Sequence, residues 1–245
     1  MKICDRVYLV GSGDFGLSHR YDCNVYLLDC GDRLALIDAG VGLDSDKIID
    51  NIANEGKDPA KVTHLFMTHS HPDHAGGAFD IANKLGCSVY APTQEGLIIS
   101  NGTNEQIGLL ENRDANYLPG YEFKHVQTVE IKDFEEVEVG DMRVQAIFTP
   151  GHSICSTCYY FTVGDKRCLC SGDAVFIKGL VAIYNSYGFD MGKYSKSLQK
   201  LSNLKIDALL PGHLGFTVYN GQICIDHAVE QFKKIDLPKS IGLLG

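Results

Sequence analysis

The stretch THSHPDHAGG, residues 68–77, places three histidines and an aspartate within six positions. Residues two apart project to the same side of an extended segment or tight loop, whereas on a helix they diverge. His69 and His71 can therefore bind one metal ion only where the chain is not helical. Pro72 favours this geometry, because it disfavours helical backbone at the preceding residue and suits the first turn of a helix starting near Asp73.

The second half of the same motif predicts a second metal ion. Asp73 and His74 are adjacent at the expected helix start, so their side chains diverge by about 100°. They serve poorly as ligands of the ion that the first histidine pair would hold. Gly76 and Gly77 leave the first helical turn bare, which lets another segment pack closely against it.

Further ligands are expected as single residues at strand ends, because a metal site built at the edge of a sheet collects one side chain from each loop. Three residues fit this description. His152 in FTPGHS and His213 in LLPGHLG each follow a strand and a Pro-Gly turn, and Asp173 in LCSGDAVF follows a strand and a glycine.

These candidates form two sets. Three imidazoles would hold one ion, while a carboxylate and two imidazoles would hold the other, with a second carboxylate bridging the pair. Both sets leave open positions and contain no cysteine, which is typical of catalytic rather than structural zinc. The first set is His69, His71 and His152, the second is Asp73, His74 and His213, and the bridge is Asp173.

Such a centre predicts hydrolysis. Two divalent ions about 3.5–4 Å apart lower the pKa of a bridging water towards neutrality, and one of them polarises a scissile carbonyl or phosphoryl oxygen. Zinc is the expected metal, with iron and manganese as alternatives. Asp73 is the candidate catalytic residue, because its carboxylate could orient the bridging hydroxide and hold its proton.

The elements around these residues alternate between β-rich segments and helices, in the order β-run, helices, β-run, helix. This order predicts two sheets packed face to face with helices outside. Residues 94–125 are expected to form an irregular surface insertion with one helix near 104–112. Asn220-Gly221 is a strong signal for a hairpin over 216–225. The other expected helices are 43–56, 76–86, 194–205 and 226–235.

Composition sets the class of partner. The chain of 245 residues is 44% hydrophobic, enough to bury the core of a single domain over 1–245. A net charge of −9 with no basic run argues against nucleic acid or an anionic membrane as partner. No apolar stretch approaches the ~20 residues of a membrane span. We expect a cytoplasmic protein with a small-molecule substrate, and a homo-oligomer stays open.

The nine cysteines are an odd number in a chain that is large enough to fold without disulfides. Buried, reduced thiols are therefore expected. The pairs Cys155/Cys158 and Cys168/Cys170 lie in apolar β-rich stretches, and a redox role for them stays open.

With its His-x-His-x-Asp-His motif and the later His152, Asp173 and His213, the chain resembles the metallo-β-lactamase fold superfamily, and in particular its binuclear hydrolase branch. The resemblance implies an α+β fold, a four-layer αβ/βα sandwich with the metals at one edge between two sheets. It also implies that Asp38 in LIDAG braces the metal loop without binding metal.

Within that family the spacing is similar to glyoxalase II and to acyl-homoserine lactonases. Only about thirty residues follow His213, however, where glyoxalase II carries a helical domain that holds glutathione. Phe176 stands where the lactonases place a tyrosine. The expected function is hydrolysis of a small thioester, ester or lactone. The alternatives are an iron-dependent, persulfide dioxygenase-like oxidoreductase, a phosphodiesterase of the same fold, and a non-catalytic sensor.

Several other residues carry weaker signals. His19, Tyr184 and Tyr187 lie in loops that could reach a substrate, but exposed or packed side chains explain them equally well. His64 is expected to be a core histidine on the strand before the motif. His125 and His227 have no companions and receive no role.

Overall fold

The computed structural model describes residues 1–109, 120–234 and 237–241. Its strands form a seven-stranded sheet in the order β1-β2-β3-β4-β5-β6-β7 and a five-stranded sheet in the order β12-β11-β10-β9-β8. The first sheet contains β1 (Lys2–Cys4), β2 (Val7–Gly11), β3 (Val25–Cys30), β4 (Arg33–Ile37), β5 (Val62–Phe66), β6 (Ser88–Ala91) and β7 (Val129–Glu130). The second contains β8 (Glu136–Val139), β9 (Met142–Phe148), β10 (Thr157–Val163), β11 (Lys166–Gly172) and β12 (Ala208–Pro211).

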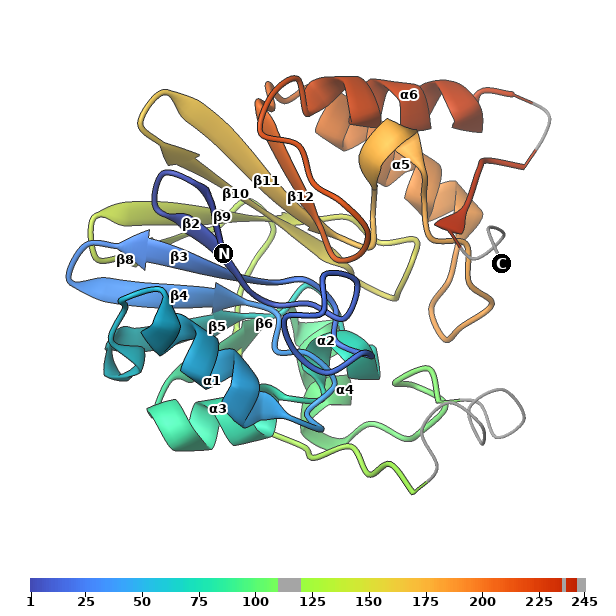
Figure 1. Cartoon of the computed structure of the whole chain (residues 1–245). Helices are drawn as coiled ribbons and strands as arrows, with labels where there is room; N and C mark the ends of the chain where they lie inside the picture. Colours follow the sequence, from blue (N-terminus) through green and yellow to red (C-terminus); the bar gives the residue numbers. More distant parts are fainter. Residues whose placement is uncertain (110–119, 235–236, 242–245) are drawn as a thin grey trace.

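The two sheets face each other, and helices cover both outer faces (Figure 1). Successive strand residues point to opposite sides. Leu9 of β2 accordingly lies in the core between the sheets, while its neighbour Val10 packs in the core beneath the helices of the first sheet. A third core lies outside the second sheet, where Leu169 of β11 packs with Leu198 and Ile225. The predicted αβ/βα sandwich is confirmed.

The helices belong to these layers. On the first sheet lie α1 (Ser45–Asn54), α3 (Ala78–Leu85) and α4 (Thr93–Asn101), and on the second lie α5 (Met191–Ser202) and α6 (Gln222–Phe232). Shorter elements are α2 (Pro72–Ala75), η1 (Pro59–Lys61) and η2 (Ile177–Gly179). Within the described residues, no helix is long and apolar enough to cross a membrane.

Strand direction brings the candidate ligands together. β11 and β12 are parallel, with Gly172 paired to Pro211, so the residues that follow both strands emerge at one edge. β9 runs in the same direction, because it and β11 are both antiparallel to β10. The loop after β5 reaches the same edge of the second sheet, where the N–H of Thr157 donates to the Thr68 carbonyl over 2.8 Å.

Two predicted local structures are wrong. Residues 104–108 form turns, and the helix in this region lies earlier, at α4, with Ile98 and Ile99 buried; residues 110–119 lie outside the described part of the chain. The hairpin over 216–225 does not form, because Gly221 is the N-cap of α6. The helical face of α6 buries Cys224, Ile225, Ala228 and Val229, a spacing typical of helix packing.

Candidate metal centre

The motif after β5 has the predicted change of backbone from extended to helical. His71 is the N-cap of α2, with φ −61° and ψ 147°, and Pro72 is the first helical residue. His69 and His71 therefore lie on extended chain, while Asp73 and His74 belong to the helix. The single turn of α2 separates the two pairs as the sequence predicted.

The first predicted set converges. His69 Nε2 lies 3.0 Å from His71 Nδ1, and His152 Nε2 lies 3.1 Å from the same nitrogen. Ligands of a tetrahedral zinc ion at about 2.05 Å are separated by about 3.3 Å. The three imidazoles are thus spaced as ligands of one ion would be.

The second predicted set converges in the same way. Asp73 Oδ2 lies 3.0 Å from His213 Nε2 and 3.5 Å from His74 Nε2. The Nε2 atoms of His74 and His213 are 3.3 Å apart. These separations also match one tetrahedral ion.

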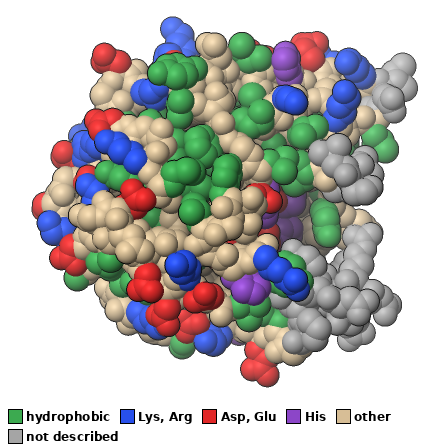
Figure 2. Space-filling model, in the orientation of Figure 1, with side chains coloured by type: hydrophobic (Ala, Val, Ile, Leu, Met, Phe, Trp, Pro, Cys, Tyr) green, Lys and Arg blue, Asp and Glu red, His purple; other side chains and the backbone are tan. Residues whose placement is uncertain are grey.

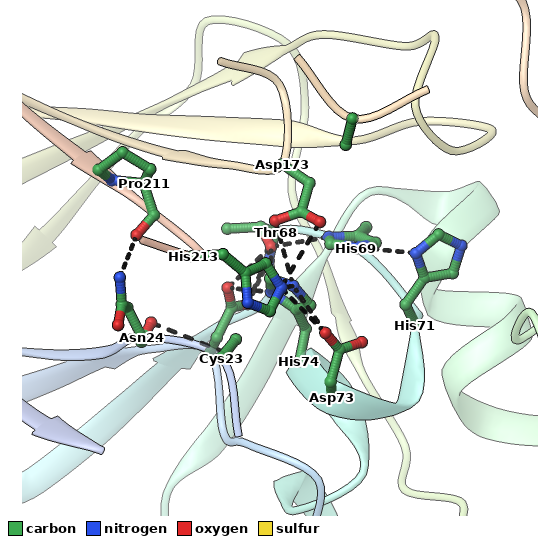
Figure 3. A network of polar contacts seen from close by, with 12 residues as sticks. Cys23, Asn24, Thr68, His69, His71, Asp73, His74, Asp173, Pro211 and His213 are labelled. Atoms are coloured by element: carbon green, nitrogen blue, oxygen red, sulfur yellow. Dashed lines mark hydrogen bonds and ion pairs between the residues drawn. The ribbon is translucent and has the colours of Figure 1, made fainter. Parts of the chain in front are cut away.

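Asp173 lies between the two sets (Figure 3). Its Oδ1 is 3.3 Å from His74 Nε2, while its Oδ2 is 3.6 Å from His152 Nε2 and 3.7 Å from His213 Nε2. Within the described part of the chain, the buried Oδ1 accepts no hydrogen bond. A buried carboxylate oxygen without a hydrogen bond is costly unless positive charge lies close to it, so the residues present fit a pair of divalent ions.

The two sets differ in exposure. His69 and His152 are buried, and Gly108 packs against the His71 ring so closely that a Cβ there would lie 3.0 Å from Cδ2. The side chains of Asp73 and His213 are 23% and 22% exposed. Figure 2 shows histidine side chains at the bottom of a recess in the surface. A substrate would therefore meet the second set first.

The comparisons with known proteins agree with this geometry. The family model described as the metallo-beta-lactamase superfamily matches residues 20–213, a range that includes all seven residues. The chain belongs to the metallo-β-lactamase superfamily.

Curated members of the superfamily are similar over much of this chain. The lactamase-like protein nscB of Neosartorya fischeri is 28% identical over 213 residues, covering 86% of this chain and 54% of that protein. The hydroxyacylglutathione hydrolase of Rhizobium etli is 28% identical, covering 67% and 53%. The atrochrysone carboxyl ACP thioesterase of Aspergillus fumigatus is 26% identical, covering 92% and 61%. This chain spans about half the length of the curated relatives it matches.

Solved structures show the same fold. A subclass B3 metallo-β-lactamase, BJP-1 of Bradyrhizobium japonicum, superimposes with a TM-score of 0.72 and covers 94% of this chain and 89% of its own. At 23% sequence identity, the likeness concerns the fold alone.

As the superfamily resemblance implied, Asp38 braces the motif. Its Oδ2 lies 2.9 Å from His74 Nδ1, and its Oδ1 accepts the Thr68 N–H at 2.8 Å. Asp38 adopts a φ of +64°, a region that side chains other than glycine rarely occupy. Cys23 lies in the same cluster, and burial raises the pKa of its thiol to about 12.

A second brace acts from α5. The buried Tyr194 hydroxyl lies 2.8 Å from the carbonyl oxygens of both Asp173 and Ala174 and accepts the Ala182 N–H at 3.2 Å. The Ala182 carbonyl in turn lies 3.0 Å from His152 Nδ1. That nitrogen therefore carries the proton, which leaves Nε2 free as a ligand.

Glu95 is a functional candidate that the sequence reasoning missed. This fully buried carboxylate of α4 accepts the Ser70 N–H at 3.0 Å, between His69 and His71 in the chain. It also accepts the Ser153 hydroxyl at 2.6 Å and the Cys155 N–H at 2.9 Å, just after His152. Glu95 thus ties together the two loops that carry the first set. The available signal was a Glu in the first turn of a helix that follows a strand.

The remaining sequence candidates lie outside the ligand sets. The N–H of His19 donates to Asp22 Oδ2 at 3.0 Å. Tyr184 and Tyr187 are exposed on the loop after η2. His64 stacks on Tyr90 with ring centroids 5.1 Å apart, which confirms a core histidine.

The cysteines are free thiols, and apart from the partly exposed Cys4 they are buried, as predicted. Burial raises the pKa of both Cys155 and Cys158 to about 12, so neither thiol is reactive near neutral pH.

We expect Glu95→Gln to weaken the first set. The amide NH₂ would face a backbone N–H in place of an acceptor oxygen, and outer partners of metal ligands typically contribute 10- to 100-fold to affinity. Cobalt titration followed by absorbance should show first-ion affinity lowered by about tenfold. Glu122→Gln, at an exposed position, is the matched control. First-ion binding equal to wild type would contradict the role of Glu95.

Metal binding should also release protons unequally. Burial, reinforced by His152, lowers the pKa of His71 to about 3, and burial also lowers the pKa of His69, so these two rings of the first set are neutral at neutral pH. Burial alone would lower the pKa values of His74 and His213, but neighbouring acidic groups, Asp73 and Asp173 among them, raise both above the usual value. An ion entering the second set must therefore displace protons.

The expected result is a second-ion affinity that falls as the pH drops below these raised pKa values, by about tenfold per pH unit for each displaced proton. First-ion affinity should fall less over the same pH range, because His69 and His71 have no protons to give up. Calorimetry in two buffers of different ionisation enthalpy measures the protons released at each step. Equal release at both steps would contradict this assignment.

Proposed function

We propose that this chain is a hydrolase of a small-molecule thioester, ester or lactone that uses two divalent metal ions, with zinc as the metal best suited to the donor set. The observation that carries the proposal is the position of Asp173. One buried carboxylate lies within 3.7 Å of ligand nitrogens from both sets, and within the described residues its Oδ1 makes an ion pair with His74 but accepts no hydrogen bond. This arrangement suits a pair of ions better than a single one.

When bound, two divalent ions supply a water that is activated near neutral pH and polarise the scissile carbonyl. The chain's own residues set the conditions for this chemistry. Burial alone would raise the pKa of Asp73, but His74 and His213 lower it to about 2. Asp73 therefore stays ionised and orients the proton of the attacking water through a carboxylate oxygen.

Two observations support a thioester or related carbonyl compound as the substrate. Two relatives, a hydroxyacylglutathione hydrolase and a carboxyl ACP thioesterase, are named as enzymes that act on thioesters. A thiolate is also a good leaving group and needs little acid catalysis. The net charge of −9 makes a nucleic-acid substrate unfavourable.

Metal analysis combined with a substrate panel tests the proposal. Purified protein loaded with zinc, manganese or iron is assayed on a thioester, an aryl ester, a lactone and a phosphodiester, with oxygen uptake recorded in parallel. We expect about two ions per chain and turnover of the carbonyl substrates. His71→Ala should lose one ion and reduce kcat by at least about 100-fold.

His227→Ala on the exposed face of α6 is the matched control, expected to keep both ions and full turnover. If His71→Ala kept its metal and its activity, the site assignment would be wrong. One iron per chain with oxygen uptake would replace hydrolysis by the oxidative alternative, and turnover of the phosphodiester alone would move the proposal to phosphodiesterases.

A further inference from the structure

An apolar surface lies directly beside the second set of ligands. We call it the apolar wall, and it consists of Phe15, Leu17, Leu214 and Phe216. Phe15 is 44% exposed and Leu214 is 37% exposed, although both are large hydrophobic residues. Leu214 directly follows the candidate ligand His213. In Figure 2, hydrophobic side chains gather on the surface beside the recess that holds the histidines.

The wall is preformed. Leu17 and Phe216 pack against the core between the sheets, and the Phe15 ring lies 5.9 Å from that of Phe216. The loop that carries Phe15 is closed by the Leu17 N–H, which donates to the Ser12 carbonyl at 2.9 Å, and by Asn51 Nδ2, which donates to the Leu17 carbonyl at 2.9 Å. A rigid surface of this kind binds a ligand without a large ordering cost.

Leu214 occupies strained backbone. Its φ is +60°, a conformation that glycine adopts readily and leucine does not. Hydrogen bonds from the Leu214 N–H to Asp14 Oδ2 and from Asn24 Nδ2 to the Leu214 carbonyl hold this backbone, while the side chain stays 37% exposed beside the candidate centre. Such strain is typical of positions whose side chain serves a ligand.

The charge beside the wall restricts what it can accept. Asp14 Oδ2 accepts the Leu214 N–H at 2.7 Å and lies 4.0 Å from His213 Nδ1. The Asp14 side chain is 43% exposed, and among the described residues no lysine or arginine pairs with it. Its negative charge disfavours an anionic group at the wall.

We propose that the apolar wall binds the uncharged alkyl or aryl part of the substrate's acyl group, immediately beside the scissile carbonyl. This inference rests on the proposed hydrolase function. The acyl side is assigned because the leaving thiolate or alkoxide gains negative charge as the bond breaks, which Asp14 would oppose. An acyl chain stays uncharged throughout and gains by leaving water.

The test uses the metal-loaded full chain and thioesters of N-acetylcysteamine, a neutral thiol, with acetyl, hexanoyl and decanoyl groups. Wild-type kcat/KM should rise by about tenfold or more from acetyl to decanoyl, as expected when methylene groups enter an apolar site. Leu214→Gly should reduce the decanoyl-to-acetyl ratio by about tenfold. Glycine suits the observed φ, so this variant removes the side chain without adding backbone strain.

Two further variants complete the design. Phe15→Ser changes a different residue of the apolar wall and should also reduce the decanoyl-to-acetyl ratio of kcat/KM. Ile223→Ser removes an exposed hydrophobic residue from α6, on the far layer of the sandwich, and should leave the ratio unchanged. Metal content and thermal melting are measured for each variant.

The outcomes separate the two proposals. If the wild-type protein hydrolyses no thioester, no ester and no lactone, the proposed function fails. If wild type hydrolyses the thioesters with equal kcat/KM at all chain lengths, or if Leu214→Gly and Phe15→Ser both keep the wild-type ratio, the wall inference is overturned while the hydrolase stands. Faster hydrolysis of acetylglutathione than of the decanoyl thioester of N-acetylcysteamine would also overturn the wall inference.

Discussion

Close contact between imidazole nitrogens is the constraint on which the rest of the structure depends. When imidazole nitrogens that face a common centre carry no proton, as metal ligands must not, their lone pairs repel one another unless a cation lies between them. The structure nevertheless holds the facing nitrogens of His69, His71 and His152 at 3.0 and 3.1 Å. Such an arrangement persists in a folded chain only where other contacts hold each ring in place, and it becomes favourable when a cation enters.

Those other contacts come from buried polar groups of separate layers. Asp38 holds the motif loop from the first sheet, Glu95 links that loop to the His152 loop, and Tyr194 fixes the backbone after β11 from α5. A buried carboxylate or hydroxyl is costly when unpaired, so each group remains in place only while its partners do. The sandwich therefore determines the ligand geometry through these groups.

The ligands themselves could be predicted from the sequence because their signal is local. The spacing of the first four ligands can be seen directly in the motif His-x-His-x-Asp-His. His152, Asp173 and His213 each follow a recognisable strand and turn. Glu95 could not be assigned in the same way, since its role depends on Ser153 and Cys155, some sixty residues away.

The errors in local structure have a similar origin. Asn220-Gly221 favours a hairpin locally. The packing of Cys224, Ile225 and Ala228 against the second sheet stabilises a helix instead. Tertiary burial outweighs a two-residue turn preference. In the same way, α4 forms where the sequence suggested irregular chain, because Ile98 and Ile99 lie on its buried face.

Because the two ligand sets are unequally exposed, the two metal ions they would hold should exchange with solvent at different rates. An ion held by the buried His69 and His152, together with the partly buried His71, lies deeper in the fold, so we expect its exchange to depend on local opening of the surrounding loops. An ion held partly by Asp73 and His213, whose side chains reach solvent, could exchange without any such opening. A chelator would then remove one ion quickly and the other at the pace of the fold itself.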